Sequence, residues 1–184
     1  MLKRIFDFAC AVTALGVLSP VMVLAWILIR LDSPGPALYR QPRFGLSGKL
    51  FTILKFRTMR QDSDSSGGFQ TLPGDTRITR VGRILRRTSI DELPQLWNIV
   101  RGEMSIVGPR PDVPAQRSLY TDAEFAKRHS VRPGLTGLAQ SRIRNVGTER
   151  QRKRFDLFYA DHASLGFDLL IILWTIRSLR KGSF

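Results

Sequence analysis

The chain has 184 residues, of which 29 are lysine or arginine and 15 are aspartate or glutamate, so its formal net charge is +14. This length accommodates one domain plus an anchor, and the charge predicts an anionic partner such as lipid headgroups, nucleic acid or a phosphorylated substrate. The single cysteine, Cys10, excludes a disulfide framework within the chain and a cysteine metal site, which fits a reducing compartment.

The first thirty residues predict a membrane segment. Residues 8–29 carry no charge, and a helix of this length, rising about 1.5 Å per residue, is long enough for a hydrocarbon core of about 30 Å. Basic residues flank both ends, with Lys3 and Arg4 before the segment and Arg30 after it. A simple span, in contrast, usually shows a charge bias toward one side.

The dipeptide Ser19-Pro20 lies near the middle of this segment. Proline removes one helical hydrogen bond and clashes with the carbonyl four residues back, and the Ser19 hydroxyl can satisfy the carbonyl that the kink frees. These features favour a re-entrant helix–break–helix anchor over residues 1–31 that returns to the face it came from, with residues 32–184 on the cytoplasmic side. The alternatives are a single span, a cleaved signal peptide and a buried helix of a soluble protein.

The segments after the anchor predict a mainly α fold with short β-strands, an α+β class. Prolines and glycine at 32–36 end the first helix, and a run rich in Ser, Gly and Asp at 61–76 predicts a mobile loop. Short strands, separated by a turn rich in Gly and Ser, are expected at residues 37–40 and 50–56. Helices are expected over residues 78–87, about 91–100, 148–163 and 165–179.

Two further segments lack a helical pattern. The prolines within residues 105–115 predict a rigid, non-helical stretch, and residues 130–147 are expected to form a loop. The helix over 165–179 is too short to span a bilayer, but Trp174 and the basic residues after it suit a helix that lies in the membrane interface. A core helix is the alternative for this segment.

Asp91 and Glu92 are adjacent carboxylates that follow Arg86 and Arg87. They have a structural explanation, because Ser89 and Glu92 have the spacing of a capping box and Asp91 alone is a good N-cap residue. They also have a functional one. Paired carboxylates can hold Mg²⁺, an aspartate can attack phosphorus to form an acyl phosphate, and arginines can neutralise phosphate oxygens.

Arg110 lies between two prolines, which fix the backbone around it. A guanidinium held this rigidly suits a phosphate or a planar base, although a plain proline-rich turn is the alternative. Gly134 and Gly137 allow close backbone approach to a ligand, and Arg142 and Arg144 follow them. No Walker A or Gly-x-Gly-x-x-Gly motif occurs, so a nucleotide here would be held in a non-standard way.

Six motifs occur in order along the chain: Lys3-Arg4-Ile5-Phe6-Asp7, Ser19-Pro20, Lys55-Phe56-Arg57-Thr58-Met59, Asp91-Glu92-Leu93-Pro94-Gln95-Leu96-Trp97-Asn98, Ser105-Ile106-Val107-Gly108-Pro109-Arg110-Pro111 and Arg132-Pro133-Gly134-Leu135-Thr136-Gly137. Together they resemble the monotopic phosphoglycosyl transferases, the bacterial sugar transferase family, over nearly the whole chain. The resemblance implies transfer of a sugar-1-phosphate from a UDP-sugar to a membrane polyprenyl (undecaprenyl) phosphate, with release of UMP, by Mg²⁺-dependent ping-pong chemistry. This is the first membrane step of glycoconjugate assembly.

The resemblance also implies roles for individual residues. Asp91 would be the nucleophile, and Glu92 would share metal binding or proton handling with it. The residues that would bind substrate or its phosphates are Arg144, Arg110, Asp156, Arg86, Lys55 and Arg57. The chain departs from the family at Leu138, where an aromatic is common, and at Arg142-Ile143, where Asn-Gly is common.

The implied setting is the cytoplasmic face of the bacterial inner membrane. The expected partners are the UDP-sugar donor, the polyprenyl phosphate acceptor and the lipid bilayer, with a homodimer possible and no nucleic acid. Nucleic-acid binding is disfavoured because the basic residues are scattered and no zinc-finger, RNA-recognition or KH signature occurs. A basic membrane adaptor without enzymatic activity is the other competing hypothesis.

Overall fold

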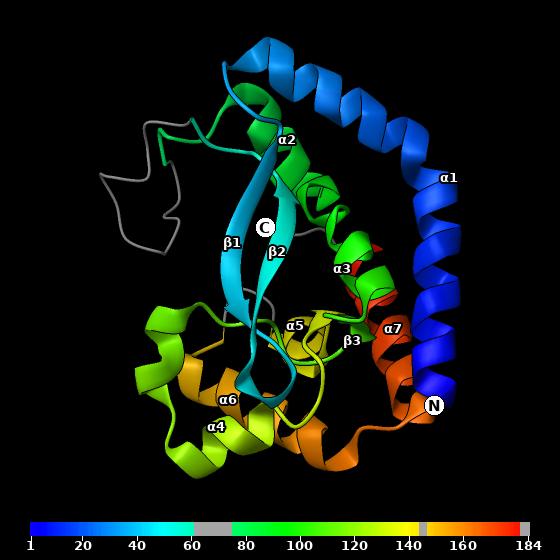
Figure 1. Cartoon of the computed structure of the whole chain (residues 1–184), viewed down its shortest axis with the longest axis vertical. Coiled ribbons are helices and arrows are strands. Elements are labelled where there is room, and N and C mark those ends of the chain that lie inside the picture. The colour runs from blue at the N-terminus through cyan, green and yellow to red at the C-terminus, as the bar shows by residue number, and fades with distance from the viewer. Residues whose placement is uncertain (61–74, 144–146, 181–184) are drawn as a thin grey trace.

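The computed structural model describes residues 1–60, 75–143 and 147–180, and Figure 1 shows their arrangement. The described residues form a mainly helical protein with short strands, so the predicted fold class is confirmed. Most of the predicted loop at 61–76, together with Arg144, lies outside the described residues. The helices are α1 (Leu2–Asp32), α2 (Arg80–Thr88), α3 (Gln95–Arg101), α4 (Asp122–Arg128), α5 (Leu138–Ile143), α6 (Glu149–His162) and α7 (Leu165–Arg180). The strands are β1 (Leu38–Phe44), β2 (Leu50–Phe56), β3 (Ser105–Val107) and β4 (Gly134–Thr136).

Helix α1 is continuous but bent. Pro20 lies inside it, and Figure 1 shows the N-terminal and C-terminal halves running in different directions. The Ser19 hydroxyl donates to the Gly16 carbonyl over 2.8 Å. Gly16 is four residues before Pro20, so its carbonyl is the one that the proline ring deprives of a partner. The predicted serine contact is therefore confirmed, and the predicted break takes the form of a bend.

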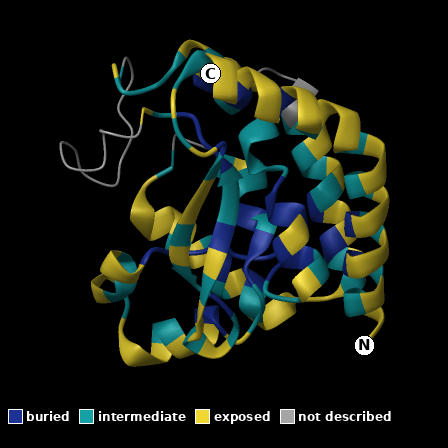
Figure 2. Cartoon of the chain, turned by 45° about the horizontal axis from the view of Figure 1, so that its top comes forward, coloured by how far each residue is buried: buried dark blue, intermediate teal, exposed yellow. Residues whose placement is uncertain are grey.

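The surface of α1 is apolar and exposed. Its most apolar 18-residue window has a mean hydropathy of 2.3, and 11% of that window is buried in the structure. By length and composition α1 could cross a membrane. Figure 2 shows that much of its surface is exposed, whereas the buried residues gather at the centre of the molecule. The core helix of a soluble protein would be mostly buried, so that alternative is disfavoured.

Strands β1 and β2 form an antiparallel hairpin in which Leu38 pairs with Phe56 and Phe44 with Leu50. The prediction for β2 is confirmed, whereas β1 is longer than the predicted strand at 37–40. Pro42 lies within β1 without ending it, because each strand of a two-stranded hairpin has an open edge where a missing N–H is tolerated.

Each half of α1 packs against a different part of the molecule. Near the N-terminus, Ala11 packs with Ile53 of the hairpin and Ile99 of α3. Beyond the bend, Ile29 packs with Phe56 and Leu85, which belongs to α2. A third cluster, formed by Val107, Leu138, Tyr159 and Ile171, joins β3 to α5, α6 and α7. The bent helix is therefore part of the core that holds α2, α3 and the hairpin together.

Two predicted segments are wrong in detail. The helix expected over 91–100 is a 3₁₀ turn, η3 (Ile90–Glu92), followed by α3, and the loop expected over 130–147 contains β4 and α5. Local pattern missed β4 because its three residues are held by a parallel pairing with β3, a segment far away in the sequence. The helices predicted over 78–87, 148–163 and 165–179 correspond to α2, α6 and α7.

The glycines expected to approach a ligand instead approach another backbone. A β-carbon on Gly134 would lie 2.1 Å from the Gly108 nitrogen and 2.3 Å from the Thr136 oxygen. A β-carbon on Gly137 would lie 2.2 Å from the Gly108 oxygen. The Pro-Gly-Leu-Thr-Gly motif therefore lets β4 pack directly on the segment that leads to Arg110, so backbone packing accounts for glycine at these two positions.

We expect Gly134→Ala to lower the free energy of unfolding by at least about 2 kcal/mol, because the new methyl group would meet backbone that cannot move aside. The matched control is Gly166→Ala in α7, where a β-carbon would have nothing within 4 Å. Alanine favours helix over glycine by up to about 1 kcal/mol, so the control should be neutral or stabilising. Unfolding in detergent followed by circular dichroism measures both, and equal effects would contradict the close backbone contact.

Candidate active site

Asp91 and Glu92 lie in the 3₁₀ turn η3 at the corner between α2 and α3. Ser89 ends α2 in the left-handed conformation, with φ 57°, and its side chain caps nothing. Helix α3 has Pro94 at its N-cap position, again without a side-chain cap. Both capping explanations for the Ser89–Glu92 segment are therefore wrong, and neither carboxylate is needed to cap a helix.

Two basic side chains hold Glu92. Its Oε1 atom accepts a hydrogen bond from the Lys55 ammonium over 2.9 Å and another from the Arg110 guanidinium over 2.8 Å. Lys55 and Glu92 are mostly buried, whereas the Arg110 side chain is 50% exposed. The structure thus brings together four predicted residues from three separate segments: Lys55, Asp91, Glu92 and Arg110.

The hairpin explains the position of Lys55. Lys55 pairs with Tyr39 across the hairpin, and alternation along each strand places Arg43 on the same face. The Arg43 guanidinium donates to the Pro111 carbonyl over 2.9 Å, next to Arg110. Sequence patterns did not single out Arg43, although its even spacing from Tyr39 places the two side chains on one face once the strand is known.

Asn98 fixes the distance between the hairpin and the helix that follows the carboxylates. Its side-chain amide donates to the Thr52 carbonyl over 2.8 Å and to the Glu103 carboxylate over 2.7 Å. Its side-chain oxygen accepts from the Leu54 backbone N–H over 3.1 Å. Asn98 is fully buried with these donors and acceptor engaged. This buried amide holds α3 to β2, which places Glu92 opposite Lys55.

The first turns of α1 contact the same scaffold. The Arg4 guanidinium donates to the carbonyls of Ile99 and Val100 over 2.5 and 2.7 Å, at the C-terminal end of α3. Buried Asp7 accepts hydrogen bonds from the Ser105 hydroxyl over 2.8 Å and from the backbone N–H of the next residue over 3.1 Å, both in β3. The apolar helix is therefore joined by polar contacts to the two elements that carry or lead to the active-site residues.

The pKa values of the two carboxyl groups are shifted in opposite directions. Burial, together with the charge of Glu92, raises the pKa of Asp91 to about 6, although Lys55, Arg86 and Arg110 oppose the rise. Burial also acts to raise the pKa of Glu92, but the charges of Arg110 and Lys55 and their hydrogen bonds overcome it and hold that pKa at about 2. Glu92 is thus ionised at any pH well above 2, whereas Asp91 is the more basic carboxylate and takes up a proton near pH 6.

Asp91 also differs from Glu92 in its contacts. In the part of the chain that the structure describes, no residue donates a hydrogen bond to the Asp91 carboxylate. The nearby Arg86 guanidinium donates to the Thr58 hydroxyl over 2.8 Å and affects Asp91 through its charge. A half-buried, basic carboxylate that accepts no hydrogen bond from these residues is suited to attack an electrophile or to ligate a cation.

Two predicted site residues lie elsewhere. The Arg57 guanidinium donates to the carbonyls of Ser33 and Pro34 over 2.7 and 2.6 Å, so it holds the turn that follows α1. Asp156 is buried on α6 and binds the Arg128 guanidinium over 2.8 Å. Both side chains are bound within the fold, and the structure does not place either beside Asp91.

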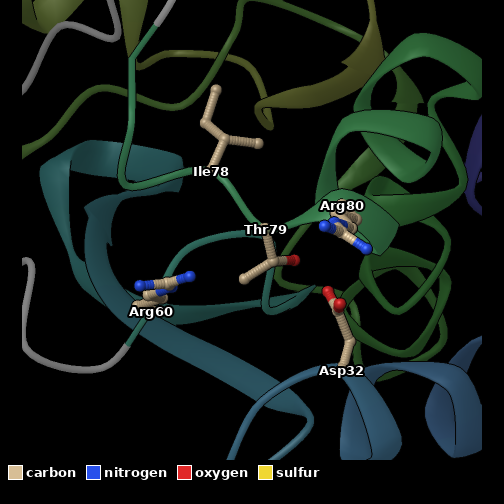
Figure 3. Close-up of a pocket in the computed structure, with 5 residues that line it drawn as sticks. All are labelled: Asp32, Arg60, Ile78, Thr79 and Arg80. Carbon is tan, nitrogen blue, oxygen red and sulfur yellow. The ribbon is translucent and has the colours of Figure 1, made fainter.

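A separate cavity of about 310 Å³ lies where α1 ends and α2 begins, and Figure 3 shows the five residues that line it: Asp32, Arg60, Ile78, Thr79 and Arg80. Two of its polar groups are engaged in the fold. Asp32 accepts from the Val81 backbone N–H over 3.1 Å, and the Thr79 hydroxyl accepts from the Gly82 N–H over 2.9 Å. These bonds cap the start of α2, so the cavity belongs to a structural junction.

The chain is similar to known proteins along nearly its whole length. Residues 1–182 match the bacterial sugar transferase family. The chain is 50% identical to the UDP-glucose:undecaprenyl-phosphate glucose-1-phosphate transferase of Caulobacter vibrioides, over 96% of this chain and 69% of that protein. It is 46% identical to the exopolysaccharide production protein PSS of Rhizobium leguminosarum bv. phaseoli, over 99% of this chain and 97% of that protein.

A third relative is named for a different sugar. The chain is 39% identical to the UDP-N-acetylgalactosamine-undecaprenyl-phosphate N-acetylgalactosaminephosphotransferase of Aeromonas hydrophila, over 98% of this chain and 44% of that protein. The chain belongs to the bacterial sugar transferase family, and the resemblance seen in its motifs is confirmed.

We expect the Asp91 carboxyl to stay protonated to a higher pH than an ordinary aspartate, because burial and the Glu92 charge both disfavour its ionised form. In metal-free protein labelled with ¹³C-aspartate, the signal that Asp91→Asn removes should titrate with a midpoint of about 6. Glu92→Gln should lower that midpoint, because it removes the neighbouring negative charge. A wild-type midpoint of ~4, the value of an exposed aspartate, would contradict this electrostatic environment.

Proposed function

We propose that this protein transfers a sugar-1-phosphate from a UDP-sugar to a polyprenyl phosphate such as undecaprenyl phosphate, releasing UMP. The observation that carries the proposal is the pair formed by a basic Asp91, which accepts no hydrogen bond from the described residues, and a Glu92 that is held ionised between Lys55 and Arg110. The names of the Caulobacter and Aeromonas relatives support the reaction class, since both transfer a sugar phosphate to undecaprenyl phosphate. The two names differ in the sugar, so the sugar stays open.

The chemistry proceeds in two displacements at one phosphorus atom. A carboxylate oxygen of Asp91 attacks the β-phosphorus of the UDP-sugar, and the bond to the bridging oxygen breaks, so that UMP leaves with the electron pair. The product is an acyl phosphate that carries the sugar. An oxygen of the polyprenyl phosphate then attacks the same phosphorus and releases the carboxylate. UMP can thus leave before the lipid substrate reacts.

The cations around the site would stabilise the charge that develops on the phosphate oxygens. The Arg110 side chain is half-exposed while it contacts Glu92, so its remaining donors can reach a substrate. Lys55 is more buried and is bound to the same carboxylate, so its charge would act on the substrate phosphates without direct contact. We assign nucleotide phosphate binding to Arg110 and electrostatic support to Lys55 and Arg86.

Asp91 and Glu92 are also the residues that would hold Mg²⁺. They supply hard oxygen ligands, and the Asp91 carboxylate accepts no hydrogen bond from the described residues, so the donor set fits this cation. No group of three or more His, Cys, Asp or Glu side chains lies together in the described ranges. Substrate phosphates would therefore complete the coordination, and a bound Mg²⁺ would neutralise charge on the diphosphate.

We expect Asp91→Asn to reduce UMP release from the UDP-sugar by at least about 10³-fold, because an amide oxygen is a poor nucleophile and the covalent step is lost. The assay combines purified protein, Mg²⁺, polyprenyl phosphate and a panel of UDP-sugars. Asp161→Asn is the matched control, since Asp161 is an exposed carboxylate on α6 that pairs with Lys127. The control should retain wild-type activity, and normal turnover in Asp91→Asn would refute the nucleophile assignment.

A UDP-sugar labelled with ³²P at the β-phosphate tests the covalent step directly. Without acceptor lipid, label should remain on denatured wild-type protein and be absent from Asp91→Asn. Chelation of divalent cations should stop UMP release, and added Mg²⁺ should restore it. A membrane adaptor without enzymatic activity would release no UMP at all, and a nucleic-acid binder would instead show steep salt dependence with DNA or RNA.

The proposed membrane placement rests on two apolar surfaces. Helix α1 exposes large apolar side chains along most of its length, and α7 buries Asp168 and Ile171 while it exposes Leu169, Leu170, Leu173 and Ile176. A helix with one buried face and one apolar exposed face suits the membrane interface. We propose that α1 enters and leaves the bilayer on the cytoplasmic side, since its bend and the basic residues at both ends fit that path.

We expect cysteines at positions 2 and 34 to be labelled from the same side of the membrane, because a re-entrant helix begins and ends at one face. The variants Leu2→Cys and Pro34→Cys, each in a Cys10→Ala background, are treated with a membrane-impermeant maleimide in intact cells and in inverted vesicles. Both positions should react only in the inverted vesicles. Labelling from opposite faces would reject the re-entrant path in favour of a single span.

A further inference from the structure

The segment around Arg110 is held through its carbonyl groups. The Arg110 carbonyl accepts from the Arg128 guanidinium over 2.7 Å, and the Pro111 carbonyl accepts from Arg43 over 2.9 Å. The Asp112 carbonyl accepts from the Phe44 backbone N–H over 2.9 Å. Three consecutive carbonyls are therefore bound by donors from two separate elements, α4 and the hairpin.

The prolines explain why side chains, and not a neighbouring strand, donate hydrogen bonds to the carbonyls of Arg110 and Pro111. Pro109 and Pro111 lack an N–H, so the segment cannot donate at those positions and cannot form a regular strand ladder. Its carbonyls nevertheless need partners, because Pro111 and Asp112 are buried. The guanidiniums of Arg43 and Arg128 supply donors that a neighbouring strand would otherwise provide. The backbone that carries Arg110 thus depends on these two side chains for its position.

Arg128 is the more constrained of the two. Its side chain is 3% exposed, and its guanidinium binds Asp112 through Nη1 and Asp156 through Nε and Nη2. The Tyr120 ring lies 5.4 Å away. Two carboxylates fix the orientation of the guanidinium, and one remaining N–H points to the Arg110 carbonyl. Asp156 is therefore linked to Arg110 through Arg128, and to Glu92 through Arg128 and Arg110.

We infer that Arg128, oriented by Asp112 and Asp156, is a positioning residue that fixes the backbone of Arg110 so that the Arg110 guanidinium meets Glu92 and the donor phosphates. The inference rests on the proposed function. It gives Asp156 a role that acts through Arg128, in place of direct substrate binding. A buried charged cluster often adds little net stability compared with a well-packed apolar one, so stability alone does not account for this cluster, whereas positioning does.

A double-mutant cycle tests the inference. Arg128→Lys keeps the charge but loses the planar fork, so it should lower kcat/KM for UMP release about tenfold through misplacement of Arg110. In an Arg110→Ala background the same substitution should change kcat/KM less than about twofold, because the group that it positions is gone. The matched control is Arg117→Lys, an arginine whose guanidinium binds the Tyr120 carbonyl and Asp122, away from the carbonyls of residues 110–112. It should match wild type in both backgrounds.

A purely structural role would give a different result. General destabilisation lowers the folded fraction equally in both backgrounds, so equal fold-losses would overturn the inference, as would wild-type activity in Arg128→Lys. If Arg128→Lys does not fold, Asp156→Asn replaces it, because the amide oxygen still accepts from Arg128 while the charge that orients it is lost. The expected pattern is the same, with a smaller loss in the wild-type background.

A readout without turnover separates this inference from the proposed function. The ¹⁵Nε–H signal of the Arg110 guanidinium, assigned by its loss in Arg110→Ala, should be sharp in wild-type protein and broadened in Arg128→Lys, but unchanged in Arg117→Lys. If no UDP-sugar yields UMP, the proposed reaction fails while this signal still decides the positioning role. An Arg110 signal that Arg128→Lys leaves unchanged would overturn the role, whatever the reaction is.

Discussion

The active site depends on one carboxylate oxygen of Glu92 that is shared by two cations. Lys55 and Arg110 both donate to Oε1, and without that negative charge their like charges would repel each other. Burial and Arg110 lower the pKa of Lys55, whereas the contact with Glu92 opposes that shift and so favours the charged ammonium. The shared oxygen therefore holds the hairpin, the α2–α3 corner and the proline-rich segment in one arrangement.

This arrangement extends to the long apolar helix. Arg4 binds the C-terminal carbonyls of α3, where a cation is also favoured by the helix dipole, and Asp7 binds the backbone of β3. Near the other end of α1, Ile29 packs against the hairpin and α2. A helix that served only as a tether would need none of these contacts. The depth of α1 in a bilayer would therefore also fix the depth of Asp91 and Glu92.

Local patterns predicted what local physics controls. The bend at Pro20, the Ser19 contact, strand β2 and the helices α2, α6 and α7 follow from neighbours within a few residues. The motifs also singled out Lys55, Asp91, Glu92 and Arg110, which the structure places together. The pattern could not show that Arg57 is occupied by the turn after α1, or that Gly134 packs on Gly108, because those partners are more than 20 residues away in the sequence.

Asp91 and Glu92 have different pKa values because, among the described residues, basic side chains donate hydrogen bonds to Glu92 alone of the two. Burial acts on both carboxyl groups in the same direction, so burial alone cannot separate their pKa values of about 6 and about 2. The separation comes from geometry, since the 3₁₀ turn directs Glu92 to the two cations and leaves Asp91 without a hydrogen bond from the described residues. Burial raises the pKa of Asp91, and the negative charge of Glu92 adds to that rise through repulsion. Two chemically similar side chains can thus divide the tasks of holding cations and attacking phosphorus.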